Sequence, residues 1–264
     1  MNTLITFIEK RKRIGIIPDQ AKRIISYLSD KPYLYLPMSM VIPHCLDNEK
    51  NTVTRIENAF ETAEVEPDLR NHLEEVEYFK KLLIEYYTVK DEKWAVADRR
   101  GLLLEELIAS ISPLKFDFFN YKENVRIYRD AIIYIESKPI IDLEIDVVFC
   151  DDDMLINAIE CKITIAGYLL PRRRKRGIGL ALDKSILCCL LTRKGKRLKE
   201  TALKKLEFFT QFQESCKKWD SQFYPWFCTM QKDVSYEKKL LKKSGFANVG
   251  IITGDVIHRI LNAS

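Results

Sequence analysis

Three features are scarce in this sequence of 264 residues: long apolar runs, paired cysteines and histidines. No apolar run approaches the roughly 20 residues that a membrane-spanning helix needs. Residues 1–15 place their basic side chains after the apolar ones and contain no small-residue cleavage site, which argues against a secretory signal. We therefore expect a cytoplasmic protein that has no membrane as a partner.

The seven cysteines are an odd number and form no Cys-x-x-Cys pair. This pattern favours reduced thiols, most of them buried, over a framework of disulfides. His44 beside Cys45 is the only place that resembles part of a zinc site, and the usual spacing of zinc ligands is missing there. The sequence therefore argues against structural zinc.

Charge is distributed unevenly along the chain. Residues 171–205 contain 13 Lys and Arg against two acidic residues, a net charge of +11, whereas residues 45–108 contain nine basic and 16 acidic residues, a net charge of −7. A basic segment of this kind is typical of a surface that faces a polyanion, but it is equally compatible with a solvated loop. Contact with nucleic acid and simple solvation both stay open for this segment.

Residues 1–97 are predicted to be mainly helical. The apolar periodicity predicts helices around Leu4, Phe7 and Ile8, from Pro18 onward, over residues 51–63 and from Glu66 onward, whereas residues 32–37 are predicted to be extended. We interpret this part as a helical region that caps the rest of the protein or forms the interface of a homodimer. The boundary is expected near residue 97, which leaves residues 98–264 as a second region.

Residues 98–264 predict a mixed order of helices and strands. A helix over residues 100–111 is followed by strands over 125–135, 141–149 and 155–163, and then by a helix over 198–217. A strand over 223–230, a helix over 235–244, a strand over 249–253 and a last helix from Asp255 complete the chain, whereas residues 185–192 fit a strand or a helix. The expected fold class is α/β, with a mixed central sheet flanked by helices and an N-terminal helical region.

The stretch over residues 141–163 is the strongest candidate for a functional site. Two β-branched apolar runs flank the acidic turn CDDD, which predicts a β-hairpin. Strand alternation places Glu160 and Lys162 on one face and Cys161 on the other, and Asp146 of the neighbouring strand can come level with them. Two carboxylates on an apolar hairpin cost free energy unless they meet a partner, and a divalent metal ion is one such partner. A charge-paired ladder on a half-exposed sheet is the structural alternative.

These residues resemble the PD-(D/E)XK nuclease superfamily, over roughly residues 98–261. Gly101 and Glu105 keep the four-residue interval of its helical glutamate, the run LEIDVVF places Asp146 at the position of its aspartate, and Glu160-Cys161-Lys162 matches its last element. The proline-aspartate pair of the superfamily name is absent. Glu144 shares the face of Asp146 and could substitute for it or assist it. The basic segment after the motif is not part of the superfamily pattern.

The resemblance implies a restriction-endonuclease-like core and a Mg²⁺- or Mn²⁺-dependent nuclease. Asp146, Glu160 and the carbonyl of Cys161 would bind the metal ion, and Glu105 would act directly or through water. Lys162 would orient the attacking water and offset charge at the phosphate. The basic segment would grip phosphates through Arg172, Arg173, Arg174, Lys175 and Arg176.

Within this interpretation, endonuclease activity is favoured over exonuclease activity, and DNA is favoured over RNA as the partner. Two alternatives remain. One is a nucleic-acid-binding protein that has a nuclease-like fold and no turnover. The other is a structural or assembly protein whose helical region makes the interface.

Overall fold

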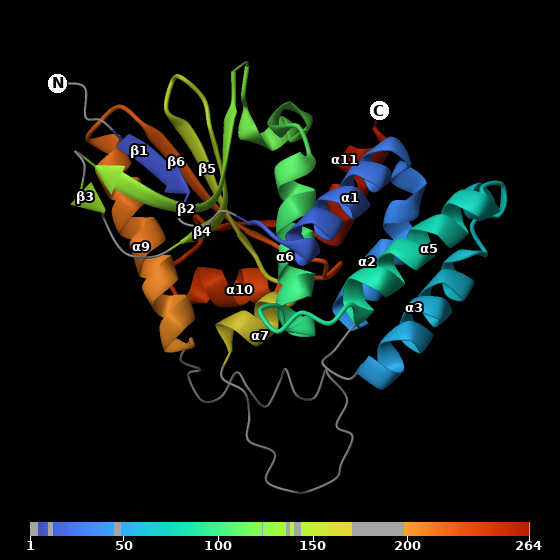
Figure 1. The fold of residues 1–264 in the computed structure, drawn as a ribbon. Helices are drawn as coiled ribbons and strands as arrows, with labels where there is room; N and C mark the ends of the chain where they lie inside the picture. The colour runs from blue at the N-terminus through green and yellow to red at the C-terminus, as the bar shows by residue number, and fades with distance from the viewer. Residues whose placement is uncertain are drawn as a thin grey trace, which may run out of the picture.

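A computed structural model describes residues 5–9, 13–44, 49–122, 124–135, 138–139, 144–170 and 198–263 (Figure 1). Its centre is a mixed sheet with the strand order β1-β2-β4-β5-β6-β7, in which β3 pairs with β2 outside this path. The strands are β1 (Ile5–Glu9), β2 (Arg126–Ile135), β3 (Lys138–Pro139), β4 (Ile145–Cys150), β5 (Leu155–Cys161), β6 (Gln222–Cys228) and β7 (Gly250–Ile252).

The sheet changes from antiparallel to parallel at β5. Strands β1, β2, β4 and β5 pair antiparallel in succession, whereas β5, β6 and β7 pair in parallel. Parallel neighbours need a crossover connection, and α9 (Glu200–Lys217) and α10 (Ser235–Lys243) supply helices in the two connections. The predicted α/β class, with helices flanking a mixed sheet, is confirmed.

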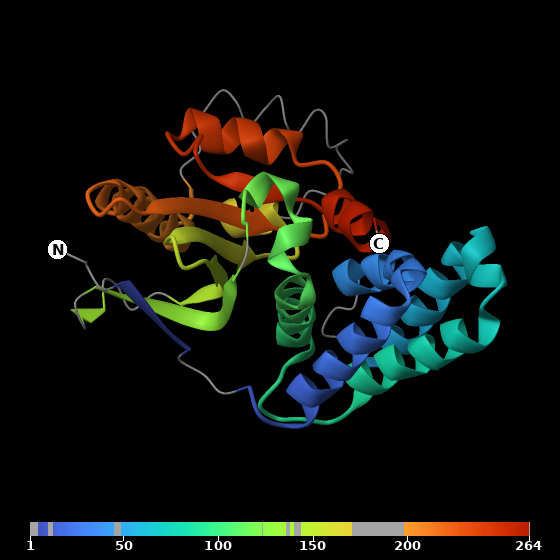
Figure 2. The ribbon, with the colours of Figure 1, turned by 90° about the horizontal axis from the view of Figure 1, so that it is seen from above.

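Two helical layers cover the sheet. One face packs against α9 through Phe208, Phe209 and Phe212, which share a core cluster with Val148 of β4 and other strand residues. On the other face, α6 (Val96–Ser110) lies between the sheet and the N-terminal helices, as Figure 2 shows from above. The placement of α6 brings the middle of this helix against strands β2, β4 and β5.

The N-terminal helices share one hydrophobic core with α6 and the sheet. This core contains residues as far apart in the sequence as Ile17, Phe79, Leu104 and Val147. The helices are α1 (Ile16–Asp30), α2 (Tyr35–His44), α3 (Glu49–Ala63), α4 (Pro67–Arg70), α5 (Leu73–Thr88) and, from the other end of the chain, α11 (Gly254–Asn262). A division of the chain near residue 97 stays a prediction.

Two local predictions in the N-terminal region are wrong. The helix expected at residues 4–8 is strand β1, because its apolar spacing also suits a strand and pairing with β2 aligns Ile5 with Ile135. The extended segment expected at residues 32–37 consists of a short 3-10 helix, η1 (Pro32–Leu34), and the start of α2. Pro32 and Pro37 both lie in first turns, where a missing backbone N–H costs little.

Most of the predicted elements of residues 98–263 are confirmed within one to four residues at each end, including the hairpin, α9, β6, α10, β7 and α11. Short elements not predicted are the 3-10 helices η2 (Pro113–Lys115) and η3 (Asp117–Phe119) and the helix α7 (Ile165–Leu169). The ambiguous segment 185–192 and the basic run 172–176 lie outside the described residues. In the part of the chain that the structure describes, no helix is both long and apolar enough to cross a membrane.

Candidate active site

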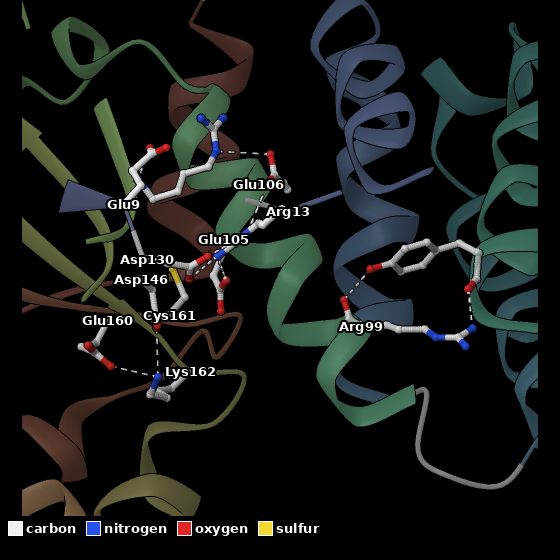
Figure 3. A network of polar contacts seen from close by, with 12 residues as sticks. Glu9, Arg13, Arg99, Glu105, Glu106, Asp130, Asp146, Glu160, Cys161 and Lys162 are labelled. Carbon is white, nitrogen blue, oxygen red and sulfur yellow. Dashed lines mark hydrogen bonds and ion pairs between the residues drawn. The ribbon is translucent and has the colours of Figure 1, made fainter. Parts of the chain in front are cut away.

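The hairpin of β4 and β5 brings the predicted acidic residues together. Val147 pairs with Ile159, and one further step of this antiparallel register places Asp146 opposite Glu160. Like charges directly opposite each other destabilise a sheet unless a cation lies between them. Lys162 supplies that cation: its Nζ lies 3.0 Å from Asp146 Oδ2 and 2.9 Å from Glu160 Oε2 (Figure 3).

Lys162 remains an ammonium group in this environment. Burial alone would lower its pKa, but the two adjacent carboxylates raise the pKa well above the usual value. The ring of Tyr168, from α7, lies 5.3 Å below the ammonium and packs edge-on against Phe227. The lysine is therefore held in place by two charges and one aromatic face.

Glu160 is held by two lysines rather than by solvent. Its side chain is only 3% exposed, and it forms ion pairs with Lys162 and with Lys205 of α9. Burial raises the pKa of Glu160, but the two ammonium groups reverse this effect and hold its pKa below the usual value. Glu160 does not line the cavity described below, so its carboxylate acts first as the counter-ion of the lysines.

Lys205 is a site residue that the sequence prediction missed. It is 6% exposed, and its ammonium group also donates a hydrogen bond to the main-chain carbonyl of Glu144. A signal was present in the sequence, because Lys205 lies three residues after Ala202 and four before Phe209, on the buried face of a helix. A lysine on such a face requires a buried acidic partner.

Asp146 lines a cavity of about 650 Å³ together with Glu105 of α6. Its Oδ2 accepts a hydrogen bond from the backbone N–H of Cys161 at 2.7 Å, which fixes the carboxylate against the end of β5. Burial and the nearby charge of Glu160 raise the pKa of Asp146, although Lys162 opposes this shift. The thiol of Cys161 is buried in the core, as predicted, so only its main chain is available to the site.

Glu105, from the α6 wall of this cavity, lines it together with Asp146. Gly101, one helical turn earlier, lines the same wall, so the predicted interval places both residues on one side of α6. Burial and the charge of Asp146 raise the pKa of Glu105 to about 8, and Arg13 counters part of this shift. Two carboxylates with raised pKa values that face one cavity form an environment that favours a cation.

Arg13, which follows β1, is the second cation that the sequence prediction missed. Its Nε and Nη2 donate to the two carboxylate oxygens of Asp130 at 2.7 and 2.6 Å. The same guanidinium contacts Glu105 Oε2 at 2.5 Å and Glu106 Oε1 at 3.3 Å, and Arg129 reaches the other oxygen of Glu106 at 3.4 Å. Local sequence offered no signal for this cluster, since 92 residues separate Arg13 from Glu105.

The chemistry of the donors fits a hard divalent cation. The ion pairs described above involve five carboxylates and four basic side chains, with a formal net charge of −1. These side chains are Glu105, Glu106, Asp130, Asp146 and Glu160 with Arg13, Arg129, Lys162 and Lys205. Within the described residues, no three His, Cys, Asp or Glu side chains lie close enough to hold a metal ion. Mg²⁺ prefers oxygen ligands, takes few protein carboxylates and keeps several waters.

Asp146, Glu105 and Cys161 line the cavity, whereas Glu160, which the resemblance implies as a direct ligand beside Asp146, does not. The structure thus brings four predicted residues together, namely Glu105, Asp146, Glu160 and Lys162. The predicted phosphate-binding residues of the basic run lie outside the described residues.

Comparisons with known proteins give little further information. No family model matches the sequence, and no curated protein matches it. Among solved structures, the chain is similar to the crystal structure of protein VC1899 from Vibrio cholerae, with 10% sequence identity and a TM-score of 0.40. The match covers 98% of this chain and 57% of that chain, so this protein spans a little over half the length of its structural neighbour.

Proposed function

We propose that this protein hydrolyses phosphodiester bonds of nucleic acid, with DNA as the favoured substrate, at a metal-dependent site of the PD-(D/E)XK type. The observation that supports this most directly is the position of the Lys162 ammonium, which lies between Asp146 and Glu160 at the edge of a cavity that Glu105 also lines. These residues occur in the order and on the elements that the resemblance predicts.

The proposed mechanism divides the work among the four predicted residues. A bound Mg²⁺ would lower the pKa of a water molecule and polarise a phosphoryl oxygen. Asp146 and Glu105 would hold the ion at the cavity wall, and the carbonyl of Cys161 would assist. Lys162 would orient the attacking water and offset charge at the scissile phosphate. Glu160, paired with both lysines, would keep the ammonium of Lys162 aimed at the cavity.

A cytoplasmic location belongs to this proposal. Four cysteines of the described residues, Cys150, Cys161, Cys216 and Cys228, are buried and form no disulfide. Free buried thiols are usual in a reducing compartment.

The second candidate is a nucleic-acid-binding protein without turnover. One observation favours it: the carboxylates of the site already have basic partners, since Lys162 contacts Asp146 and Arg13 contacts Glu105. A site in which side chains supply the cations can hold its shape without a metal ion. This candidate predicts salt-sensitive binding and no cleavage with any metal.

Cleavage assays separate the two candidates. The protein would be incubated with supercoiled, linear duplex and single-stranded DNA and with RNA, in Mg²⁺, Mn²⁺ or EDTA. We expect metal-dependent cleavage that falls at least about 100-fold in Lys162→Met, the size of effect expected for a group that directs proton transfer. Lys162→Arg retains the charge and tests whether the geometry of the ammonium matters.

Lys204→Met is the matched control, because Lys204 is exposed on α9 and its ion-pair partner within the described residues is Glu200. It should cleave like the wild type. Circular dichroism confirms that each variant is folded. Equal cleavage by wild type and Lys162→Met would assign the activity to a contaminant and remove the proposal.

A further inference from the structure

The cavity extends beyond the carboxylates along one side of α6. Its lining includes Asp98, Gly101 and Glu105, which follow one another at intervals of three and four residues and so share a side of the helix. Lys93 and Trp94, just before the helix, continue this wall. From Val96 to Glu105 the helix rises about 14 Å, so the cavity is a groove with Glu105 toward one end and Asp98 and Trp94 toward the other.

The end of the groove at Trp94 is held rigidly. The side chain of Arg99 is buried, and its Nε donates to the carbonyl of Trp94 at 3.0 Å. The same guanidinium donates to the carbonyls of Tyr86 and Val89 at the end of α5, at 2.8 Å each. Part of the Trp94 ring packs against the core, and the rest lines the groove. Because Arg99 fixes the main chain of Trp94, less freedom remains to be lost when the ring stacks on a base.

The groove also has apolar walls that suit the faces of bases. Ile14, which is 78% exposed, and Ile163, which follows the catalytic motif, line it together with Leu102. In a duplex the faces of the bases are stacked on one another and cannot reach such walls. Unpaired bases expose these faces, and each stacking contact with an aromatic side chain contributes about 1–3 kcal/mol.

Charge sets a second requirement on the ligand. The groove is lined by three basic and five acidic side chains, a net charge of −2; they are Arg13, Lys93 and Lys162, with Asp98, Glu105, Asp130, Glu144 and Asp146. A phosphate backbone can therefore enter only beside the basic residues or together with a divalent cation at the carboxylates. Lys93 is exposed along this path, and Lys162, which pairs with Asp146 and Glu160, lines it as well.

We propose that this groove binds an unpaired stretch of nucleic acid, with a base stacked on Trp94 and the following phosphates directed toward Lys162. The inference rests on the proposed function and narrows its substrate class to single strands or to unpaired segments of a duplex. Trp94 is the residue that selects unpaired bases, and the carboxylates select a phosphate that arrives with a cation.

The test measures binding rather than cleavage. Fluorescence anisotropy of a labelled 12-nucleotide single strand and of the matching duplex would be recorded in EDTA and in Ca²⁺. We expect the single strand to bind more tightly than the duplex, and Ca²⁺ to strengthen its binding. Trp94→Ala should weaken binding of the single strand about 5- to 150-fold, the range that corresponds to the loss of one stacked base. Trp94→Phe should keep most of the affinity for the single strand, because phenylalanine can also stack on a base.

Two further variants keep the result specific to the groove. Tyr224→Ala removes an aromatic side chain that is 40% exposed on β6 and does not line the groove, and it should bind like the wild type. Gly101→Leu should block the groove, whereas Gly101→Ala adds a methyl group that would lie 3.6 Å from Glu105 Oε1, an ordinary contact. The leucine variant should therefore lose far more affinity than the alanine variant.

Failure of this inference and failure of the proposed function give different results. If Trp94→Ala binds the single strand like the wild type, or if the wild type binds the duplex as tightly as the single strand, the groove proposal is wrong even where cleavage occurs. If single strands bind through Trp94 but no metal supports cleavage, the hydrolytic function is wrong and the groove proposal stands.

Discussion

Two buried arginines at helix α6 serve different purposes. Arg99, in the first turn of the helix, donates to three main-chain carbonyls, whereas Arg13 contacts three carboxylates beside the middle of the same helix (Figure 3). Both side chains are nearly inaccessible, so both had to be desolvated during folding. The difference lies in the partners: carbonyls are neutral at every pH, and carboxylates carry a charge that a cation or a proton must balance.

The two networks differ in the charge of their acceptors. The carbonyl partners of Arg99 connect the end of α5 to the start of α6 and impose no excess charge. The network around Arg13 holds more carboxylates than basic groups, and Glu105 at its edge has a raised pKa. Excess buried negative charge lowers stability unless a cation or a proton balances it.

Removal of Arg99 should produce the largest effect on stability. In Arg99→Met three carbonyls lose a charged donor, and we expect the free energy of unfolding to fall by about 3 kcal/mol, because each buried acceptor left without a partner costs about 1–3 kcal/mol and water can replace some of the donors. The loss should be the same at pH 5 and pH 8. Urea titrations monitored by circular dichroism measure it.

Arg100→Met is the matched control for this prediction. Arg100 is the next residue of the helix, and its hydrogen bond to the carbonyl of Pro43 is long, at 3.5 Å. Its replacement should cost less than about 1 kcal/mol. A loss below 1 kcal/mol in Arg99→Met, or equal losses in both variants, would show that the carbonyl network does not stabilise the junction of α5 and α6.

The carboxylate network should make stability depend on pH, with a smaller effect. The pKa of Glu105 is about 8 in the folded protein and near 4.5 when unfolded, so the folded state binds the extra proton between these values. In EDTA the free energy of unfolding should therefore fall as pH rises from about 5 to 8. Full linkage would give about 1.4 kcal/mol for each unit by which the pKa is raised. We expect a smaller total fall, about 2 kcal/mol, because the side chain is 17% exposed and solvent screens part of the effect.

Glu105→Gln should flatten this pH dependence, since the amide does not titrate. Glu77→Gln, at an exposed carboxylate of α5, should leave it unchanged. Urea titrations at pH 5, 6, 7 and 8 provide the comparison. Stability that rises with pH over this interval in the wild type would contradict the raised pKa of Glu105.

The part of the site that could be predicted from the sequence is the part that local geometry determines. Asp146, Glu160 and Lys162 lie on one hairpin, where the acidic turn and the alternation of side chains fix their relative positions. Gly101 and Glu105 lie one turn apart on one helix, so their spacing alone places them on one side. The predicted contacts within these two elements needed no knowledge of the rest of the fold.

The residues that were missed make contacts across the fold. Arg13 lies 92 residues from Glu105, and Lys205 lies 61 residues from the carbonyl of Glu144 that it contacts. Such pairs depend on how β1 and α9 pack against the sheet, which no local pattern specifies. The same reason explains the error at β1, because its five residues suit a helix or a strand until β2 is available to pair with them.

The smallest expected effect joins the stability comparison to the proposed metal site. An ion that binds only the folded state stabilises it by about 1.4 kcal/mol at ten times its dissociation constant, which should raise the melting temperature by about 3–5 °C. Mg²⁺ should produce this rise at pH 8 in the wild type and in Arg99→Lys, because the partners of Arg99 are main-chain carbonyls and not carboxylates. Asp146→Asn should show no rise, because it removes one of the two cavity carboxylates that we propose hold the ion. Asp152→Asn is the control on the same hairpin, since Asp152 is exposed in the turn and, in the part of the chain that the structure describes, forms its ion pair with the exposed Arg126. Equal rises in all four proteins, measured by differential scanning fluorimetry, would place the ion on the general surface rather than between Asp146 and Glu105.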